Sequence, residues 1–559
     1  MKINLKYSLI IILITQWLVS CSNNSAKVDL IIRNATIYTV NETFDLAQAI
    51  AINNGKIVGI GAEHEILNKF ATDHLIDAKK QTILPGFYDA HCHFVGYAKG
   101  LQEIDLVGTT SFEEVINRIK KFEQQTDTKF LLTDTTTSIK WIVGRGWDQN
   151  DWDNKTYPTK EKLDELFPET PVYLTRIDGH AALLNQKALD VAEITITSKI
   201  EGGIVEIKNN QLTGILIDNA MELVKHKIPT YTKKQLAEAL MVAQKNLFEV
   251  GLTTINDAGL NSYEIELIDE LQQQQKILIN VYAMISATPE MLDYYLAKKP
   301  YKTNKLNVRS FKFYADGALG SRGACLIHPY SDLLSQQGLL INTPEFYRKY
   351  APLLYAKGYQ MNTHCIGDSA NRLILSVYKE VLKTTNDKRW KIEHAQVIHP
   401  EDFEKFKAIT VIPSIQPTHA TSDMYWAKDR LGAERLKNAY AYKQLVQENG
   451  IVALGTDFPV EAISPIKTFY AAVFRMDDKG FPTGGFQAEN GLTREETLKG
   501  MTIWAAISNF EENERGSLEV GKNADFIILD RDIMKVDAQE VLKTNVVMTF
   551  VDGKMVYTK

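Results

Sequence analysis

Short apolar segments recur along the central part of the chain, and most are separated by stretches long enough to form a helix. Eight of these segments have the length and apolar character of buried strands. They begin near residues 82, 251, 277, 310, 360, 390, 411 and 451. Strands that alternate with helices are typical of a parallel α/β sheet, so this pattern predicts a (β/α)₈ barrel of the TIM type over residues 82–505.

One interval breaks this rhythm. The step from Leu84 to Gly251 is far longer than a single helix requires. We therefore expect an insertion after the first barrel strand, over about residues 100–245, that covers the mouth of the barrel. A doubly wound open sheet is the alternative architecture, but no glycine-rich phosphate-binding loop follows the first strand.

Both ends of the chain have the pattern of β-structure. Asn54-Gly55 and Asp552-Gly553 each lie between β-rich segments and predict tight hairpin turns. A single hairpin cannot bury an apolar face by itself. We therefore expect residues 22–81 and 506–559 to form one small β-sandwich domain, with the barrel inserted between its halves.

The first 21 residues have the pattern of a signal peptide. Lys2 and Lys6 precede the apolar run from Tyr7 to Val19. As a helix this run would span only about 20 Å, against about 30 Å for the hydrocarbon core of a membrane. The run ends in Leu18-Val19-Ser20-Cys21, which resembles the lipobox of bacterial lipoproteins and implies lipidation of Cys21. An ordinary secretory signal with an incidental cysteine is the alternative.

The lipobox resemblance also implies a location. The polar residues after Cys21 are expected to form a short tether, and Ser22 in place of aspartate favours the outer membrane. We expect a protein anchored by lipid in the bacterial cell envelope, facing the periplasm or the exterior.

Composition narrows the classes of partner. Hydrophobic residues make up 45% and charged residues 24% of the chain, as in ordinary globular proteins. The formal net charge of −6 argues against nucleic acid as a partner. The four cysteines, at 21, 92, 325 and 365, are too scattered for a disulfide scaffold. We expect a small-molecule substrate, membrane contact through the lipid anchor and, as a further hypothesis, a homodimer.

Side chains capable of binding metal follow several predicted strands. His91 and His93 come after the first strand, two positions apart, so extended backbone points both to one side. His364, His394 and Asp457 follow the fifth, sixth and eighth strands. The carboxyl ends of barrel strands meet at the face where such barrels hold active sites. Several imidazoles together with a carboxylate are suitable ligands for a divalent metal.

Lys312 lies within the fourth predicted strand, where a buried ammonium ion is costly. Taken singly, a buried histidine is more often a core residue than a ligand, and a buried aspartate often only caps a loop. Four histidines and an aspartate at the same end of one barrel favour a metal site over separate structural roles.

Several motifs resemble those of the amidohydrolase superfamily. They are Leu84-Pro85-Gly86-Phe87-Tyr88-Asp89-Ala90-His91-Cys92-His93, Gly455-Thr456-Asp457 and the segment 516–525. Three further segments resemble the amidohydrolase-3, YtcJ-like branch, which includes N-substituted formamide deformylase. These segments are residues 144–149, 312–322 and 414–419. The resemblance covers nearly the whole chain after the tether.

The resemblance implies a site with two metal ions, usually zinc. The ligands it implies are His91 and His93 with Asp457 for the more buried ion, and His364 with His394 for the second. Lys312 matches the position of a lysine that CO₂ carboxylates and that then bridges both ions. Cys92 is expected to point away from the two histidines beside it, because side chains alternate along a strand.

In the implied mechanism, Asp457 accepts a proton from the attacking water and passes it to the departing nitrogen. His180 is a candidate to polarise the substrate carbonyl, with a loop histidine that bonds backbone as the alternative; His419 is a second candidate. Further residues are expected to shape the pocket or contact substrate: Arg145, Trp147, Asp148, Asp316 and Arg322. Trp147 is alternatively a core anchor of the insertion, and Asp316 and Arg322 alternatively pair with each other.

These features predict a metal-dependent enzyme that cleaves a carbon–nitrogen bond other than a peptide bond, such as an N-acyl or N-formyl amide. One alternative is hydrolysis of another ester or a phosphoester. A phosphoester is less favoured because we find no cluster of basic residues in the sequence that could bind a phosphate. The other is a catalytically inactive substrate-binding lipoprotein. Such a protein would be expected to have lost at least one metal position, and none is missing.

Overall fold

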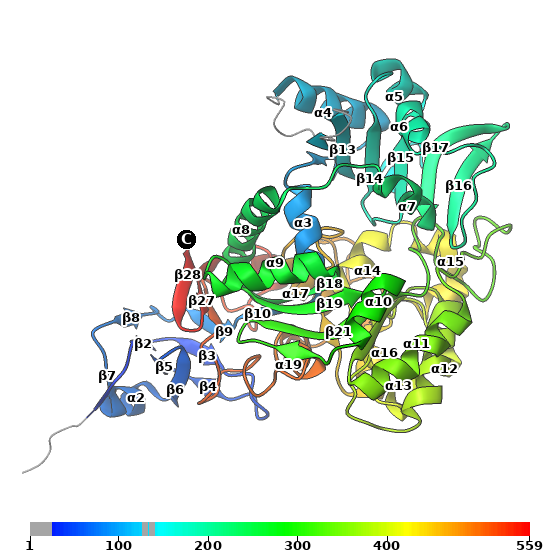
Figure 1. Ribbon diagram of the computed structural model, residues 1–559. Coiled ribbons are helices and arrows are strands. Elements are labelled where there is room, and N and C mark those ends of the chain that lie inside the picture. Colours follow the sequence, from blue (N-terminus) through cyan, green and yellow to red (C-terminus); the bar gives the residue numbers. More distant parts are fainter. Residues whose placement is uncertain (1–24, 126–131, 134–139) are drawn as a thin grey trace, which may run out of the picture.

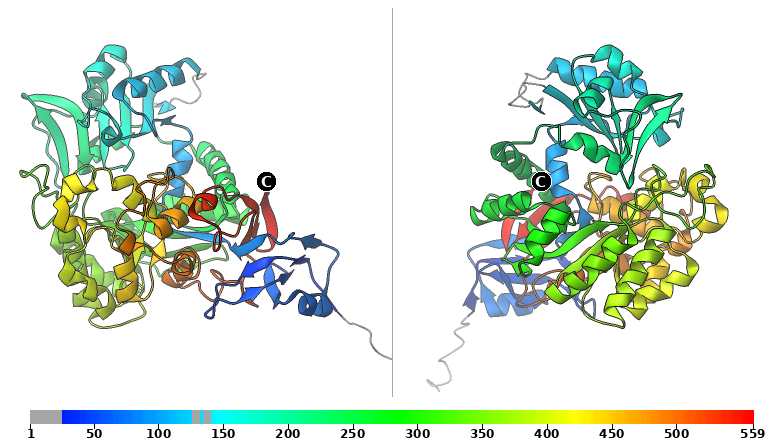
Figure 2. Two further views of the ribbon diagram at one scale, coloured as in Figure 1. Left: turned by 180° about the vertical axis from the view of Figure 1, so that it is seen from behind. Right: turned by 45° about the vertical axis from the view of Figure 1, so that its right-hand side comes forward.

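The computed structural model describes residues 25–125, 132–133 and 140–559. The predicted signal segment and Cys21 lie outside these residues. The described chain forms a central barrel, a small β-domain built from both ends and an insertion domain (Figure 1). Figure 2 shows the insertion domain and the β-domain on different sides of the barrel. No helix among the described residues is long and apolar enough to cross a membrane.

The barrel sheet has eight parallel strands that pair side by side in chain order. They are β10 (Phe87–Cys92), β18 (Leu252–Leu260), β19 (Asn280–Ser286), β21 (Leu306–Tyr314), β22 (Gln360–Cys365), β23 (Lys391–His394), β24 (Ile412–Ile415) and β25 (Ala453–Leu454). Backbone hydrogen bonds close the seam between β25 and β10, from Asp457 N to His91 O (2.7 Å) and from His93 N to Phe458 O (2.8 Å). The prediction of a TIM-type barrel is confirmed.

Helices cover the outside of the barrel. Both α8 (Lys233–Glu249) and α9 (Ser262–Gln273) begin with a capping box, in which side chains satisfy backbone N–H groups of the first turn. Further barrel helices are α10 (Pro289–Leu296), α11 (Pro344–Lys357), α12 (Asp368–Leu382), α13 (Phe403–Ala408), α16 (Tyr442–Asn449), α17 (Pro465–Phe474) and α18 (Arg494–Gly500). Their apolar faces share one continuous core with the strands.

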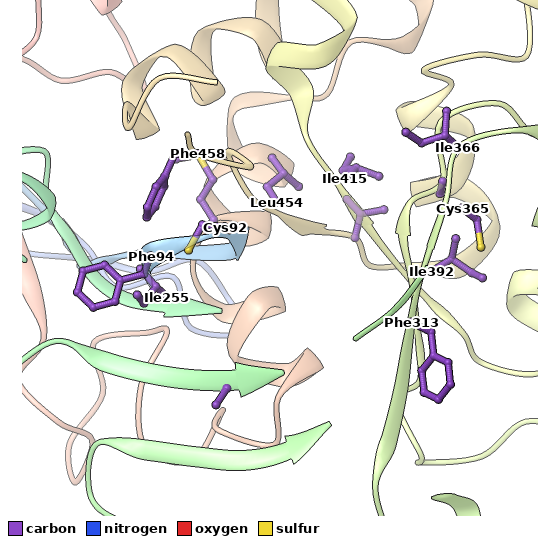
Figure 3. Packing of buried hydrophobic residues seen from close by; sticks show 14 of the residues in the cluster. Cys92, Phe94, Ile255, Phe313, Cys365, Ile366, Ile392, Ile415, Leu454 and Phe458 are labelled. Atoms are coloured by element: carbon purple, nitrogen blue, oxygen red, sulfur yellow. The ribbon is translucent and has the colours of Figure 1, made fainter. Parts of the chain in front are cut away.

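The side chain of Cys92 lies in this core. Its Sγ donates a hydrogen bond to Asn256 O at 3.3 Å, and Figure 3 shows it among apolar side chains that include Phe94 and Phe458. Because side chains alternate along a strand, the neighbouring His91 faces the barrel interior instead.

The first barrel strand differs from the prediction. The segment that begins at Thr82 forms β9 (Thr82–Pro85), which pairs with β26 (Phe526–Leu529) and β3 (Thr36–Tyr38) in the β-domain. The barrel strand begins only at Phe87, after Gly86. A Cβ on Gly86 would lie 2.3 Å from Thr253 Oγ1, so only glycine lets the chain pass this close to the barrel. Two apolar runs separated by one glycine look like a single strand in the sequence.

The β-domain consists of two sheets with the orders β6-β5-β2-β8 and β28-β27-β26-β9-β3-β4. The remaining strands are β2 (Leu30–Arg33), β4 (Leu46–Ala47), β5 (Ala49–Asn53), β6 (Lys56–Gly61), β8 (Leu75–Asp77), β27 (Val546–Val551) and β28 (Lys554–Thr558). Ile32 and Ile50 share a core with Phe526 and Phe550, whose rings stack with centroids 4.4 Å apart. The two ends of the chain therefore bury one common apolar face, as predicted.

The insertion domain has its own sheet, ordered β11-β13-β14-β15-β17-β16, with β12 beside β13. Its strands are β11 (Ile104–Asp105), β12 (Leu132–Thr133), β13 (Lys140–Trp147), β14 (Val172–Arg176), β15 (Ala181–Leu184), β16 (Gly203–Lys208) and β17 (Gln211–Asp218). Helix α8 follows this sheet but packs into the barrel core through Leu236 and Leu240. The expected end of the insertion near residue 245 is therefore too late, because the amphipathic pattern of α8 does not say which domain it covers.

Gly455 lies at the barrel seam and provides a test of how tightly the seam is packed. A Cβ at this position would lie 2.4 Å from His91 N and 2.8 Å from Asp89 Oδ1. Because backbone cannot move aside like the end of a side chain, we expect Gly455→Ala to lower the free energy of unfolding by about 1–3 kcal/mol in urea titrations.

Gly100→Ala, in α3 (Phe94–Gly100), is the matched control, because no described atom lies within 4 Å of the added Cβ. This variant should be as stable as the parent or slightly more stable. Equal unfolding free energies for the two variants would contradict a tightly packed seam.

Candidate metal centre at the barrel mouth

The structure brings all six predicted metal ligands together at the carboxyl-terminal end of the barrel. They come from the strands or from the residues directly after them: His91 and His93 from β10, Lys312 from β21, His364 from β22, His394 from β23, and Asp457 after β25. All six are buried except for His93, whose side chain is 28% exposed. Residues far apart in the sequence thus form one compact group.

Three of these residues offer donor atoms close enough for one cation. The ligand atoms of His91, His394 and Asp457 all lie within 4.8 Å of one another. The ring of His364 lies next to that of His394, with centroids 4.5 Å apart. Nδ1 of His394 is buried and has no hydrogen-bond partner in the described part of the chain. The imidazole nitrogens, which include the buried Nδ1 of His394, and the carboxylate are suitable ligands for a divalent metal ion.

The backbone turns sharply where two of these side chains leave their strands. His394 has φ 71°, Ala395 has φ 44° and Asp457 has φ 64°, in the left-handed region that non-glycine residues rarely adopt. Such conformations are retained where the surroundings fix them, and they cluster at functional sites. Here they direct His394 and Asp457 toward the centre of the barrel mouth.

The charge states of the group suit metal binding. Burial, followed by the charges of neighbouring groups, lowers the pKa of His364 and His394 well below the ordinary histidine value. Burial alone would raise the pKa of Asp457, but a hydrogen bond from His93 and the nearby histidines hold that pKa well below its ordinary value. At neutral pH, His364 and His394 are therefore neutral imidazoles and Asp457 is a carboxylate.

Glu393 belongs to the candidate site by its contact with His91, and the sequence analysis missed it. Its Oε2 lies 2.5 Å from Nδ1 of His91, and both side chains are fully buried. A carboxylate at Nδ1 fixes the proton on that nitrogen and leaves Nε2 for a metal. His93 is held similarly, with Nδ1 3.0 Å from the carbonyl oxygen of Ala258. The available signal was a glutamate inside a buried strand, directly before a histidine.

Lys312 is buried beside the same histidine. Its Nζ lies 2.9 Å from Nε2 of His91. Burial lowers the pKa of Lys312 to about 8, although the negative charges of Glu393 and Asp457 oppose this change. A larger fraction of Lys312 is therefore a neutral amine at neutral pH.

Two other predicted histidines border the group. The ring of His180, from the insertion domain, lies 5.2 Å from that of His364, between centroids. Its Nδ1 lies 2.6 Å from Oδ1 of Asp218, a partner that the sequence analysis missed. His419, in α14 (Pro417–Asp423), places Nε2 3.5 Å from Oδ2 of Asp457.

The three predicted pocket residues of β13 and the turn after it have different surroundings. Trp147 is 1% exposed, packs in the insertion core and donates a hydrogen bond to Leu174 O, so it is a core anchor. Arg145 donates to the carbonyl oxygens of Pro459 and Ile177, both at 2.6 Å, and thus ties the insertion to the barrel. Asp148 forms an ion pair with Arg176.

Asp316 and Arg322 do not pair with each other. Asp316 is fully buried and accepts hydrogen bonds from the backbone N–H groups of Cys325, Ile366 and Gly367. Arg322 forms an ion pair with Asp332 at 3.0 Å. Both contacts brace the loop after β21.

Comparison with known proteins agrees with this geometry. The model of the Amidohydrolase family matches residues 74–557. The chain is 29% identical to a putative amidohydrolase, YtcJ, from Bacillus subtilis, over 94% of this chain and 98% of that protein. It is 24% identical to N-substituted formamide deformylase from Arthrobacter pascens, over 95% and 98%.

Among solved structures, an uncharacterized metal-dependent hydrolase from Pyrococcus horikoshii superposes with a TM-score of 0.73 at 27% identity, covering 91% of this chain and 99% of that one. The family model spans the barrel, the insertion and the C-terminal part of the β-domain, and it includes every predicted metal ligand. This chain belongs to the amidohydrolase family.

Proposed function

We propose that this protein is a metal-dependent hydrolase of amide-type carbon–nitrogen bonds, such as those of N-acyl or N-formyl amines. The observation that carries the proposal is the convergence of buried donors from His91, His394 and Asp457 at the mouth of the barrel. The printed name of the Arthrobacter pascens relative, a formamide deformylase, supports an amide substrate.

In this proposal two zinc ions occupy the site. His91 and His93 with Asp457 would hold one ion, His364 and His394 the second, and a carboxylated Lys312 would bridge them. When bound, the metals supply Lewis acidity that polarises the substrate carbonyl and favours deprotonation of water.

The side chains of the protein provide the proton transfers. Asp457 is ionised, accepts a proton from the attacking water and then donates it to the departing nitrogen. Nε2 of His419, 3.5 Å from Oδ2 of Asp457, can stabilise the carboxylate before it accepts the proton and after it has donated that proton. His180 reaches over from the insertion domain. Burial opposes its protonation, but the hydrogen bond and the charge of Asp218 raise its pKa, and the imidazolium donates a hydrogen bond from Nε2 to the oxyanion that develops from the carbonyl.

The charges near the mouth favour an amide over a phosphoester. Arg145 is engaged by two backbone carbonyls, and Arg176 is paired with Asp148 and Asp178. Guanidinium groups that are already engaged offer little to a phosphate. The alternative of an inactive binding protein is less favoured because all six ligand positions are filled by residues able to bind metal.

A hydrolysis screen of metal-loaded protein tests this proposal. The panel contains N-acyl and N-formyl amines, cyclic amides, carboxylic esters and phosphoesters, and the measurement is release of amine, alcohol or phosphate. We expect turnover of amides and, with Asp457→Asn, a fall in kcat of about 10²-fold or more, because a general acid and base is lost.

Asp402→Asn is the matched control, since Asp402 is a buried carboxylate at the start of the barrel helix α13, away from the candidate ligands, and pairs with Arg372 and Lys405. It should keep near-normal kcat. Turnover of phosphoesters alone would overturn the amide proposal, and a normal kcat for Asp457→Asn would remove this residue from the mechanism.

Carboxylation of Lys312 predicts a dependence on CO₂. Metal uptake by apoprotein should increase when bicarbonate is present, because the carbamate offers two oxygens that share one negative charge, whereas an ammonium ion would repel the cations. Lys312→Ala should lose metal and activity, and a short carboxylic acid such as propionate should restore part of both.

Lys391→Ala is the control for this rescue. Lys391 is also a buried lysine of the barrel interior, but its Nζ donates to Asn509 Oδ1 at 2.5 Å. No carboxylic acid should rescue that variant. Full metal occupancy of Lys312→Ala without any added acid would show that no bridging lysine is needed.

We also propose that lipid on Cys21 anchors the protein in the cell envelope, with the outer membrane favoured. Cys21→Ala should abolish labelling by fatty acid and move the processed protein from membrane to soluble fractions, because a single protein–lipid link is then lost. Processed Cys21→Ala protein that stays with membranes at high salt would contradict the proposal.

A further inference from the structure

Asp218 connects the insertion domain to the candidate site. It ends strand β17, and its side chain is fully buried. Oδ1 lies 2.6 Å from Nδ1 of His180, and the backbone N–H of Asp218 donates to the carbonyl oxygen of His180 at 2.9 Å. The carboxylate and the backbone of one residue thus both hold this histidine.

The backbone of Asp218 is in an unfavourable conformation for a residue with a side chain. Its φ of 51° and ψ of −126° belong to a region that glycine adopts far more readily. Glycine would relieve this strain. The presence of an aspartate here suggests that its carboxylate contributes something that outweighs the conformational cost.

Two glycines of the barrel make room for this carboxylate. Gly317 and Gly323 lie in the loop after β21 and are joined by a hydrogen bond from Gly317 N to Gly323 O at 3.3 Å. A Cβ on Gly317 would lie 2.6 Å from Oδ2 of Asp218, and a Cβ on Gly323 would lie 2.7 Å from the same atom. We call this pair the glycine notch. Any larger residue at either position would displace the Asp218 side chain.

The notch fixes His180 relative to the barrel. Asp218 occupies Nδ1 of His180, so Nε2 is the ring nitrogen left for a substrate, and the ring lies 5.2 Å from that of His364. We propose that Asp218, seated in the glycine notch, is a positioning residue that orients His180 toward the reacting carbonyl. This inference rests on the proposed function of His180 and adds a reason for the glycine at position 317 in the segment 312–322.

Asp218→Gly separates positioning from a merely structural role. It removes the carboxylate and also relieves the backbone strain, so the melting temperature should be at least that of Asp218→Ala, which keeps the strain. We expect kcat of Asp218→Gly to fall about 10- to 100-fold with metal content unchanged, as when the partner of an oriented histidine is removed.

A comparison with His180→Ala tests whether Asp218 affects kcat through His180. The double variant His180→Ala/Asp218→Gly should be no slower than His180→Ala alone, because both changes remove the same oriented group. Asn210→Gly, at another residue with positive φ (60°) in the turn between β16 and β17, is the control and should keep parental kcat. Parental kcat in Asp218→Gly together with a slow His180→Ala would overturn the positioning role.

The glycine notch is tested separately from catalysis. Gly317→Ala should lower the melting temperature in the parent but much less in the Asp218→Gly background, because the clash partner is then absent. If Gly317→Ala lowered the melting temperature equally in both backgrounds, the claim that the glycine notch makes room for Asp218 would be contradicted. These melting-temperature measurements need no substrate, so they test the glycine notch even if the hydrolysis screen finds no turnover. Parental turnover in His180→Ala would instead overturn the role of His180, and the positioning claim with it.

Discussion

Hydrogen bonds across the barrel seam hold the fold and the candidate site together. Asp89 accepts from Thr456 N at 3.0 Å, from Thr456 Oγ1 at 2.7 Å and from His91 N at 3.1 Å. The next residue, Asp457, donates its N–H to His91 O at 2.7 Å. His91 and Asp457 are themselves members of the candidate site, so closing the barrel also brings these candidate metal ligands together. Burial makes each of these bonds costly to lose.

The barrel interior beneath the site is also polar. Lys391 and Glu393 lie two positions apart on β23 and therefore face the same interior, where Lys391 contacts Asn509 and Glu393 contacts His91. Hydrogen bonds between charged groups are strong in a buried environment and hold both partners in place. In this protein the network supports His91 from below, while the insertion domain bounds the site from above through Arg145 and His180.

Much of the barrel, and the grouping of the candidate ligands at its mouth, could be predicted because both leave local signals. Apart from Lys312, which lies within its strand, each candidate ligand follows or ends an apolar segment, and parallel strands bring their carboxyl ends to one face. The start of the first strand was wrong because β9 and β10 are separated only by Gly86. Glu393 and Asp218 escaped prediction for another reason. Each acts through a residue distant in sequence, and no pattern of spacing reveals which segments will meet.

Residue type was also a poor guide to role at several positions. Trp147 and Asp316 belong to the motifs that identify the family branch, yet one is a core anchor and the other binds three backbone N–H groups. Both roles depend on burial and on partners, which the sequence does not show. The motifs therefore predicted the family more reliably than they predicted which contacts each motif residue makes.

The most direct test of the account is a crystal structure of the metal-loaded protein with anomalous diffraction data collected on both sides of the zinc absorption edge. The account predicts two anomalous peaks, one contacted by His91, His93 and Asp457 and the other by His364 and His394. Ions bound at other residues, or a fully active crystal form with no metal among these side chains, would contradict it.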